Sequence, residues 1–396
     1  MPRHRARNLS LLLAMLVSAG CQRAASPLNH DMYVWQLAWT PAVSAALAAT
    51  APAMTRVHVL ALEIDPVGGL RQPSLDAAAL HALSQPLVAV VRIDGRVTDL
   101  PPAIDHIRAM LQEWQRLQLP MQALEIDFDC GTAQLDRYAG FLAEVRPLLP
   151  RDVKLMITAL PAWMASQRLP ELIGAADQVV LQVHSVMDPV QGLFDADQAY
   201  QWIEKFSAIA TQPFLIALPT YGSEVRWDED GRILAVTSET TARIGSGVNR
   251  ELAVDPVTMS AFVRRLARHP VAKLAGIAWF RMPTAADERA WSVATFLAVV
   301  RSDPLQRSVV ARLVANGSGG DIVIENTGLL DAPVPQSIQL RGTCREADAV
   351  NGFVLERTGH TLQWTRTTDR MMRAGAVVSV GWANCEPVST PLEVSY

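Results

Sequence analysis

Lysine is scarce in this chain of 396 residues: only Lys154, Lys205 and Lys273 occur, and the arginines are scattered along the sequence rather than grouped. Lysine and arginine together number 35 against 39 aspartate and glutamate residues, which gives a formal net charge of -4. A protein that binds nucleic acid by electrostatic attraction needs a concentrated basic surface. The composition therefore argues against a nucleic-acid partner.

Charged residues are few as well. They make up 19% of the chain, against roughly 25% in ordinary soluble domains, and half of the residues are hydrophobic. This composition supplies a large core and excludes disorder over most of the length. The length fits two domains, or one (β/α)8 barrel with an appendage.

Several catalytic and ligand-binding motifs are missing. The chain has no CxxC or HxxxH spacing, which argues against a zinc site, and no GxSxG elbow for a serine nucleophile. A doubly wound fold would carry a glycine-rich phosphate turn after its first strand, but Trp39-Thr40-Pro41 stands there. We expect no cofactor and no resident metal; a hard cation held by Asp127 and Asp129 is the alternative.

The N-terminus has the pattern of a signal peptide over residues 1–21. Arg3, Arg5 and Arg7 precede an apolar run whose length, about 18 Å as a helix, is too short to span a bilayer core of about 30 Å. Residues 16–21 (LVSAGC) resemble a bacterial lipobox, which implies diacylation of Cys21. Plain secretion with an incidental Cys21 is the alternative.

If Cys21 is lipidated, the mature chain is anchored to a membrane of the bacterial cell envelope. Gln22 follows the cysteine and, by resemblance to sorting rules, implies the periplasmic face of the outer membrane. Residues 22–30 would then form a tether.

An oxidising compartment makes a disulfide possible among the remaining cysteines. Cys344 and Cys385 both lie in the C-terminal hundred residues, and we expect them to pair, with two buried thiols as the alternative. Cys130 is left single, and we expect an inert, partly buried thiol.

Eight apolar, β-type runs alternate with amphipathic helical stretches between residues 31 and 302. The runs cover residues 33–38, 57–64, 87–93, 123–128, 153–159, 178–184, 214–218 and 274–280. Helical stretches such as 104–117 and 135–148 lie between them. Apolar strands separated by helices indicate a parallel sheet buried on both faces, and eight such units predict a closed (β/α)8 TIM barrel.

The pattern changes after Asp303-Pro304. Short strand-like runs at 309–314, 320–326, 338–341, 353–356 and 377–382 are separated by Gly, Asn and Pro without helical periodicity. We expect residues 305–396 to form a small all-β, sandwich-like domain.

Reactive groups of a TIM barrel lie at the carboxyl ends of its strands. At the fourth strand Glu125, Asp127 and Asp129 alternate, so all three project to one side. Mutual repulsion on a buried face should keep at least one of them protonated near neutral pH, as a general acid requires. A structural salt-bridge lattice with Arg92 and Arg281 is the alternative. The other strand ends supply candidate ligand-binding residues: Trp35, Asp94, Gln182, His184, Tyr221, Trp279 and Arg281.

The stretch from Gln122 to Asp129 (QALEIDFD) resembles the fourth-strand motif Asp-Gly-x-Asp-x-Asp-x-Glu of glycoside hydrolase family 18, the chitinase-like barrels. Glu125 and Asp127 match its second and third Asp, and Asp129 matches the Glu that serves as general acid. Gln122 and Ala123 replace the leading Asp-Gly.

Other strands are similar to the same family. Residues 218–222 (LPTYG) resemble its seventh-strand Pro-x-Tyr-Gly, Trp279 resembles the eighth-strand Trp that floors the sugar site, and Gln182-Val183-His184 stands where Met-x-Tyr is usual. Taken whole, the chain is similar to the bacterial lipoprotein family labelled domain of unknown function 3142.

The resemblance implies substrate-assisted, retaining hydrolysis of a glycan that contains N-acetylhexosamine. Asp127 would orient the N-acetyl group, Asp129 would protonate the leaving oxygen, and His184 would donate to the N-acetyl oxygen in place of Tyr. Asp129 is one methylene shorter than Glu, and a misplaced proton donor can cost about a hundredfold in rate. A non-catalytic glycan-binding or envelope scaffold protein is therefore the alternative.

Overall fold

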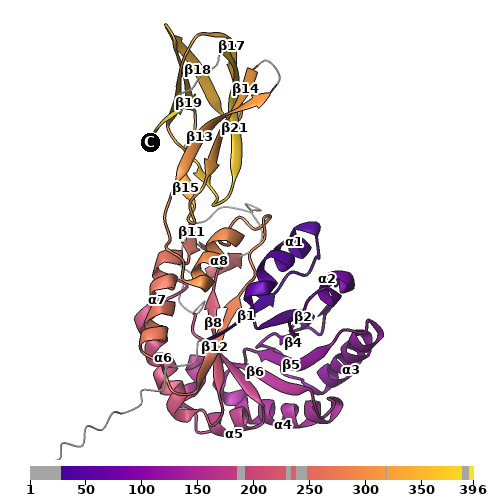
Figure 1. Ribbon diagram of the computed structural model, residues 1–396. Coiled ribbons are helices and arrows are strands. Elements are labelled where there is room, and N and C mark those ends of the chain that lie inside the picture. The colour runs from indigo at the N-terminus through magenta and orange to yellow at the C-terminus, as the bar shows by residue number, and fades with distance from the viewer. Residues whose placement is uncertain (1–27, 185–191, 229–232, 238–247, 317–318, 386–391) are drawn as a thin grey trace, which may run out of the picture.

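The computed structural model describes residues 28–184, 192–228, 233–237, 248–316, 319–385 and 392–396. Within them, an α/β barrel is followed by an all-β domain that stands at one end of the barrel (Figure 1). The expected signal peptide, Cys21 and most of the expected tether lie outside the described residues.

Parallel strands form the barrel wall. They are β1 (Asn29–Val34), β2 (Arg56–Ile64), β4 (Leu87–Ile93), β5 (Met121–Phe128), β6 (Lys154–Ala159), β7 (Gln178–Gln182), β8 (Phe214–Pro219) and β12 (Leu274–Phe280). The sheet closes because β1 pairs with both β12 and β2. The short β3 (Leu70–Arg71) pairs antiparallel with the end of β2. The predicted (β/α)8 TIM barrel is confirmed.

The first strand lies earlier in the chain than its apolar pattern predicted. It starts at Asn29 rather than Tyr33, so the last residues of the expected tether belong to the barrel. The reason is that Asp31 is fully buried inside the barrel, where Arg56 and His58 compensate its charge. A hydropathy pattern does not detect a buried carboxylate of this kind.

Helices cover the outside of the barrel. They are α1 (Pro41–Thr50), α2 (Ala77–His81), α3 (Pro101–Arg116), α4 (Leu135–Val145), α5 (Leu169–Gly174), α6 (Ala196–Ile209), α7 (Pro256–Arg268) and α8 (Val293–Arg301). Asp195 and Asp255 begin α6 and α7 by accepting hydrogen bonds from two backbone N–H groups each. Between these elements lie the short helical turns η1 (Ala51–Ala53), η2 (Thr132–Gln134), η3 (Arg146–Leu148) and η4 (Pro161–Ala165).

Alternation along the strands divides the barrel residues into two layers. One set faces the helices: on α3, for example, the stripe of Ile107, Met110 and Trp114 is buried against the sheet. The other set faces the barrel axis and includes Val90, Ala123 and Met156. Polar residues join this inner layer toward the carboxyl ends of the strands, where the candidate site lies.

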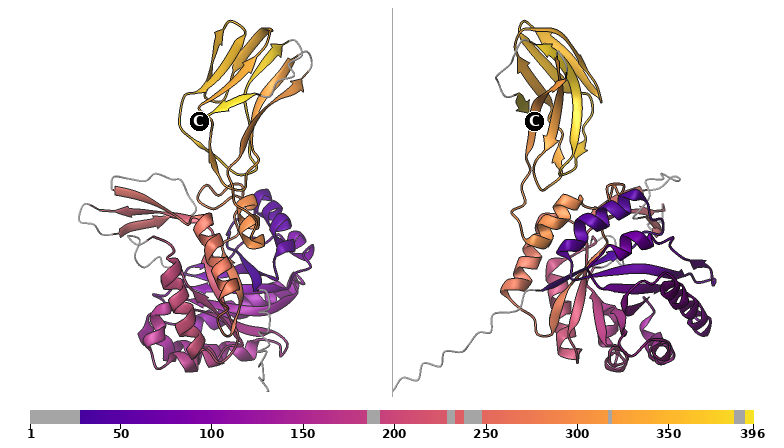
Figure 2. Two further views of the ribbon diagram at one scale, coloured as in Figure 1. Left: turned by 60° about the vertical axis from the view of Figure 1, so that its left-hand side comes forward. Right: turned by 45° about the vertical axis from the view of Figure 1, so that its right-hand side comes forward.

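A three-stranded antiparallel sheet interrupts the last β/α units. It consists of β9 (Gly222–Trp227), β10 (Ile233–Thr237) and β11 (Val248–Ala253), in the order β10-β9-β11. Figure 2 (left) shows this sheet projecting from the barrel. Strands β9 and β10 pair as an antiparallel hairpin, and the segment that connects them lies outside the described residues.

The C-terminal domain is a sandwich of two antiparallel sheets, as predicted. Its strands are β13 (Val309–Asn316), β14 (Gly319–Asn326), β15 (Ala332–Pro333), β16 (Ser337–Arg341), β17 (Cys344–Ala349), β18 (Phe353–Thr358), β19 (Thr361–Arg366), β20 (Met371–Met372), β21 (Val377–Cys385) and β22 (Glu393–Ser395). One sheet has the order β13-β14-β21-β17 and the other β18-β19-β16-β22. Between them lies a core that contains Ile322, Ile338 and the fully buried Trp364.

A disulfide joins Cys344 to Cys385 between the paired strands β17 and β21. The domain contacts the barrel through Arg373, which donates hydrogen bonds to the carbonyl oxygens of Asp287 (2.6 Å) and Ala290 (2.7 Å). These backbone acceptors lie in the loop between β12 and α8.

None of the helices in the described part of the chain combines the length and the apolar character that a membrane crossing requires.

Candidate functional site

The three acids of β5 lie at successive depths of the barrel. Glu125 is fully buried, Asp127 is 6% exposed, and Asp129, just beyond the strand, is open to solvent. Alternation along the strand turns all three to the same side, as expected. The acids therefore lead from the interior to the carboxyl end of the barrel.

Gln182 joins the two outer acids. Its side-chain amide, at the end of β7, donates one hydrogen bond to Oδ1 of Asp127 (3.2 Å) and another to Oδ1 of Asp129 (3.1 Å). Thr158, at the end of β6, donates to the same oxygen of Asp127 (2.8 Å). Oδ2 of each acid is outside these contacts.

The two acids hold protons more tightly than ordinary aspartates. Burial raises the pKa of Asp127 well above its usual value, and the charge of Asp129 raises it further, although Arg92 and Thr158 oppose the change. Desolvation of its carboxyl group and the charge of Asp94 also raise the pKa of Asp129, against the opposing effects of Arg92 and Gln182. Such a pair retains a proton at higher pH than a free carboxyl group, as a general acid requires.

Glu125 belongs to a separate, internal network. It accepts hydrogen bonds from the Tyr33 hydroxyl (2.6 Å) and pairs with Nδ1 of His58 (2.9 Å). Nε2 of His58 contacts Asp31 (3.1 Å), and Asp31 pairs with Arg56 (2.7 Å). Two negative and two positive charges thus compensate one another inside the barrel. Glu125 contacts these buried groups rather than the mouth, so its predicted role as a catalytic residue is not supported by its position.

Sequence reasoning missed Tyr33 and His58. Both lie on apolar strands at registered positions of β1 and β2, directly opposite each other. A polar residue within an apolar run was the available signal, but its partner Glu125 lies on a strand distant in sequence.

Arg92 connects the acids to the neighbouring strand β2. Glu63, Arg92 and Asp127 are registered side by side on β2, β4 and β5. Arg92 forms an ion pair with Glu63 (2.5 Å), and its charge lowers the pKa of Asp127 and Asp129 relative to burial alone. The alternative of a structural salt-bridge lattice is therefore supported only in part. Arg92 lies near Asp127 and Asp129, but it forms its ion pair with Glu63.

Aromatic rings gather around Phe280 at the end of β12. The ring of His184 stacks on Phe280 (centroids 5.7 Å apart), and Trp35 (4.8 Å), Tyr33 (5.6 Å) and Tyr221 (5.8 Å) meet it edge-on. Trp35, His184 and Phe280 are partly exposed. These three partly exposed rings, with Asp127 and Asp129, form the mouth of the barrel, and flat aromatic faces suit the apolar faces of a sugar.

The prediction that Trp279 floors the site is wrong. Trp279 is fully buried on the outer side of β12, where it packs against Phe296 of α8 and donates a hydrogen bond to Nδ1 of His30 (3.0 Å). Consecutive strand residues point to opposite faces, so the next residue, Phe280, faces the inside.

Two other expected ligand-binding residues have structural partners. Arg281 is 2% exposed and forms an ion pair with Asp287 (2.5 Å), beneath the ring of Tyr221. Its expected role as a direct ligand of the substrate is not supported, because it is buried. Asp94 lies at the mouth and pairs with Arg96 (2.9 Å).

His184 lies at the mouth, but its side chain offers a hydrogen-bond acceptor rather than the expected donor. Burial lowers its pKa to about 4, so the imidazole is neutral at neutral pH. Its Nδ1–H donates to the carbonyl oxygen of Ala217 (3.4 Å), which leaves Nε2 without a proton. In this state His184 does not donate the expected hydrogen bond to an N-acetyl oxygen. Its Nε2 can instead accept a hydrogen bond from a hydroxyl group or an amide N–H.

No group of three or more histidine, cysteine or acidic residues with the geometry of a metal site occurs among the residues that the structure describes. Cys130 is buried, and burial raises the pKa of its thiol to about 12, which fits the expected inert thiol.

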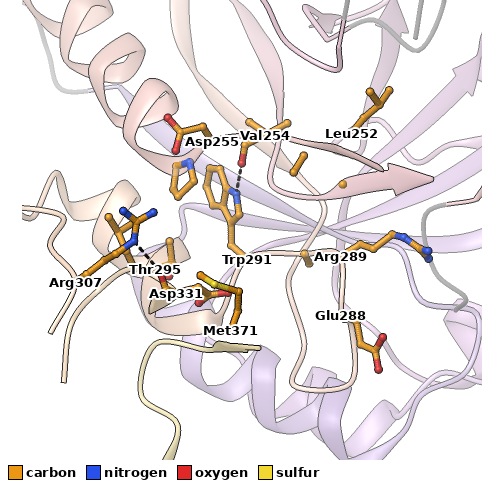
Figure 3. A pocket seen from close by; sticks show the side chains of 15 residues that line it. Leu252, Val254, Asp255, Glu288, Arg289, Trp291, Thr295, Arg307, Asp331 and Met371 are labelled. Atoms are coloured by element: carbon orange, nitrogen blue, oxygen red, sulfur yellow. Dashed lines mark hydrogen bonds between the residues drawn. The ribbon is translucent and has the colours of Figure 1, made fainter. Parts of the chain in front are cut away.

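Within the described part of the chain, cavities open at two places away from the acid pair. One, of about 370 Å³, lies at the carboxyl ends of β2 and β4 and is lined by Glu63, Asp65, Arg71, Arg92, Asp94 and Arg96, among others. The other, of about 440 Å³, lies where the β9–β11 sheet, the barrel and the C-terminal domain meet. Figure 3 shows its wall, with Nε1 of Trp291 directed at the carbonyl oxygen of Val254 (2.7 Å). Residues of the barrel and of the C-terminal domain both line this cavity, so it is a seam between the two domains.

Solved structures of enzymes share this fold. The spore cortex-lytic enzyme SleL of Bacillus cereus is 13% identical with a TM-score of 0.51, over 70% of this chain and 74% of that chain. SleL of Bacillus megaterium is 12% identical with a TM-score of 0.50, over 70% and 75%. A chitinase from Chromobacterium violaceum is 14% identical with a TM-score of 0.49, over 69% and 98%. The barrel of this chain thus shares its fold with the two SleL structures.

No curated protein matches the chain. The model of a family described as domain of unknown function (DUF8456) matches residues 310–386, within the C-terminal domain. The model of the family described as domain of unknown function (DUF3142) matches residues 83–285, just over half of the chain and most of the barrel. As expected from its sequence, the chain belongs to the DUF3142 family.

Proposed function

We propose that the barrel is a glycoside hydrolase that cleaves a glycan containing N-acetylhexosamine. The observation that carries the proposal is the pair of Asp127 and Asp129, bridged by Gln182, with raised pKa values at the carboxyl end of the barrel. Partly exposed aromatic rings gather at the same end of the barrel. The solved structure of a spore cortex-lytic enzyme shares this fold, and the lytic activity in its name supports the choice.

Asp129 is the proton donor in this proposal. It is the solvent-exposed member of the pair, and its raised pKa keeps a proton available for the leaving oxygen. Asp127, deeper and fixed by Thr158 and Gln182, orients the N-acetyl group whose oxygen attacks the anomeric carbon. Water then completes the reaction with Asp129 acting as the base.

The test is the release of reducing ends from N-acetylglucosamine oligomers and from peptide-free peptidoglycan strands. Asp127→Asn should abolish turnover while binding is nearly retained, and Asp129→Ala should lose the rate on natural glycans. Aryl glycosides with activated leaving groups need no protonation, so Asp129→Ala should cleave them with a smaller loss. Asp129→Glu, which restores the usual reach, should keep or raise the rate.

A matched control is Asp105→Asn, which changes an exposed acid of α3 that pairs with Arg108. This variant should behave as wild type. Wild-type protein that cleaves none of these glycans would contradict the hydrolase.

The second candidate is a glycan-binding protein without turnover, and the observation that favours it is the short reach of Asp129. In that case no variant cleaves glycan, and affinity is lost mainly on truncating the aromatic mouth at Trp35 or Phe280. Calorimetry that shows binding by a wild type without cleavage would support this function.

A further inference from the structure

The cavity at the ends of β2 and β4 differs from the acid site in the charge it presents. Three arginines line it, with exposed side-chain fractions of 61% for Arg71, 37% for Arg92 and 79% for Arg96. Their acidic partners lie deeper, at 13% for Glu63 and 25% for Asp94. The guanidinium groups are therefore outermost, and a ligand in this cavity, which we call the arginine pocket, meets positive charge first.

The carboxylates of the arginine pocket position its arginines. Glu63 pairs with Arg92 through Oε1 (2.5 Å) and with Arg71 through Oε2 (3.5 Å), so one carboxylate holds two guanidinium groups. A guanidinium has five N–H donors, and each of these pairs uses a fraction of them. Asp94 holds Arg96 in a bidentate pair (2.9 and 3.0 Å).

The remaining acid is used by its own loop. Oδ1 of Asp65 accepts hydrogen bonds from the backbone N–H groups of Val67 (3.0 Å) and Gly69 (2.7 Å). A side chain at Gly69 would collide with this carboxylate, since an added Cβ would lie 2.3 Å from Oδ2. The loop between β2 and β3 thus forms a built wall of the pocket.

The arginine pocket adjoins the acid pair. Glu63, Arg92 and Asp127 are registered on three neighbouring strands, so the backbone of Arg92 lies about 5 Å from that of Asp127 and the backbone of Glu63 about 10 Å from it. A sugar chain of a few units can contact both places. A substituent on a sugar near the cleaved bond would therefore reach the arginines.

We propose that the arginine pocket binds a carboxylate carried by a sugar of the glycan, so that the substrate is an acidic heteropolymer of N-acetylhexosamine rather than a neutral homopolymer. The proposal rests on the proposed function for the position of the acid pair. Planar, bidentate donors of arginine suit a carboxylate better than a lysine would. The carboxylate can belong to a uronic acid or to the lactyl group of muramic acid.

Calorimetry can measure the preference without turnover in an Asp127→Asn background. The probes are a hexasaccharide of alternating glucuronic acid and N-acetylglucosamine, a peptide-free hexasaccharide of N-acetylglucosamine and muramic acid, and the neutral N-acetylglucosamine hexamer. We expect at least one acidic probe to bind about tenfold more tightly than the neutral one. Salt should weaken that binding and leave the neutral probe unchanged. Which acidic probe binds identifies the source of the carboxylate.

The decisive comparison removes the arginine charges from the pocket and measures the affinity for the acidic and the neutral probe. Arg71→Gln with Arg96→Gln should weaken the acidic probe by about tenfold and leave the neutral probe within about twofold. The matched control is Arg116→Gln on α3, because Arg116 is 69% exposed and forms a bidentate pair with Glu113 (2.6 and 2.7 Å) like that of Arg96. The control should change neither affinity.

Equal affinity for acidic and neutral probes, or an equal loss in the Arg116→Gln control, would overturn the arginine pocket. Cleavage of the neutral hexamer by wild type without an acidic preference would keep the proposed hydrolase and overturn this inference. Tight, pocket-dependent binding of an acidic probe without cleavage of any glycan would support the pocket and overturn the hydrolase.

Discussion

The raised pKa values of Asp127 and Asp129 predict how the activity of the proposed hydrolase depends on pH. An acid with a raised pKa is protonated below that pKa, so kcat/KM should be highest at lower pH. Above the pKa of the pair it should fall by about tenfold per pH unit. Arg92 lowers both pKa values relative to burial alone, because its positive charge favours the carboxylates. Arg92→Gln should therefore move the alkaline limb of the profile to higher pH.

The pH–rate profile of Arg92→Gln should be compared with that of Arg116→Gln, which removes an equal charge on α3. A limb that stays in place, or moves to lower pH, in Arg92→Gln would show that the titrating group is not this pair.

The internal pair of His58 and Glu125 should matter for stability rather than for chemistry. Burial by itself lowers the pKa of His58, but the charge of Glu125 and the hydrogen bonds to Asp31 and Glu125 outweigh it, and the pKa is raised. A raised folded-state pKa stabilises the fold fully below the unfolded value of about 6.5, and this contribution is lost as pH rises through the folded-state pKa.

His58→Gln should therefore lower the free energy of unfolding by about 3–5 kcal/mol in mildly acidic solution, since two buried carboxylates lose a positive partner. The loss should shrink as the pH rises. Urea unfolding from about pH 5 to about pH 9 measures it, with His81→Gln on the exposed end of α2 as the control. A loss that is constant with pH would contradict a charged His58.

At the scale of elements, the disulfide between β17 and β21 should stabilise the C-terminal sandwich. It closes a loop with a sequence separation of 41, which restricts the unfolded chain by about 4 kcal/mol. Cys344→Ser with Cys385→Ser should lower the melting temperature of the sandwich transition and leave that of the barrel in place. Calorimetry with and without reductant checks this, and Cys130→Ser serves as the control. A barrel transition that moves equally would show that the domains unfold together.

The elements were predictable because their apolar periodicity is strong. Alternating buried strands and amphipathic helices predicted the barrel, and short strands between turn residues predicted the sandwich. The strand ends also indicated Asp127, Asp129 and Gln182, which the structure brings into contact. The prediction for Trp279 was wrong because consecutive residues of a strand point to opposite faces. Phe280, the next residue, faces the mouth instead.

The internal network around Glu125 and His58 could not be predicted from the sequence, for a different reason. The burial of Asp31 depends on Arg56 and His58 of the next strand, and that of Glu125 on Tyr33 and His58 across the barrel. Only the closed sheet brings these groups together. Hydropathy therefore placed both ends of this strand too late, at residues 33–38 rather than Asn29–Val34.

At the scale of the whole molecule, the two domains form a defined junction. Arg373 of the sandwich donates to the carbonyl oxygens of Asp287 and Ala290 in the loop that follows β12. Asp287 in turn pairs with Arg281, directly after Phe280. The sandwich thus contacts the loop that directly follows Phe280, a residue of the aromatic mouth.

Cys21 precedes the first strand of the barrel by only a short segment of the sequence. We propose that a diacylated Cys21 anchors the protein, because two acyl chains give stable membrane attachment where one chain gives only marginal binding. Cys21→Ser should release the protein from the membrane fraction into the periplasm, whereas Cys130→Ser should leave it in the membrane. Fractionation of cells labelled with radioactive palmitate measures both the attachment and the lipid. A Cys21→Ser protein that stays in the membrane fraction, or a wild type without label, would contradict the anchor and favour secretion.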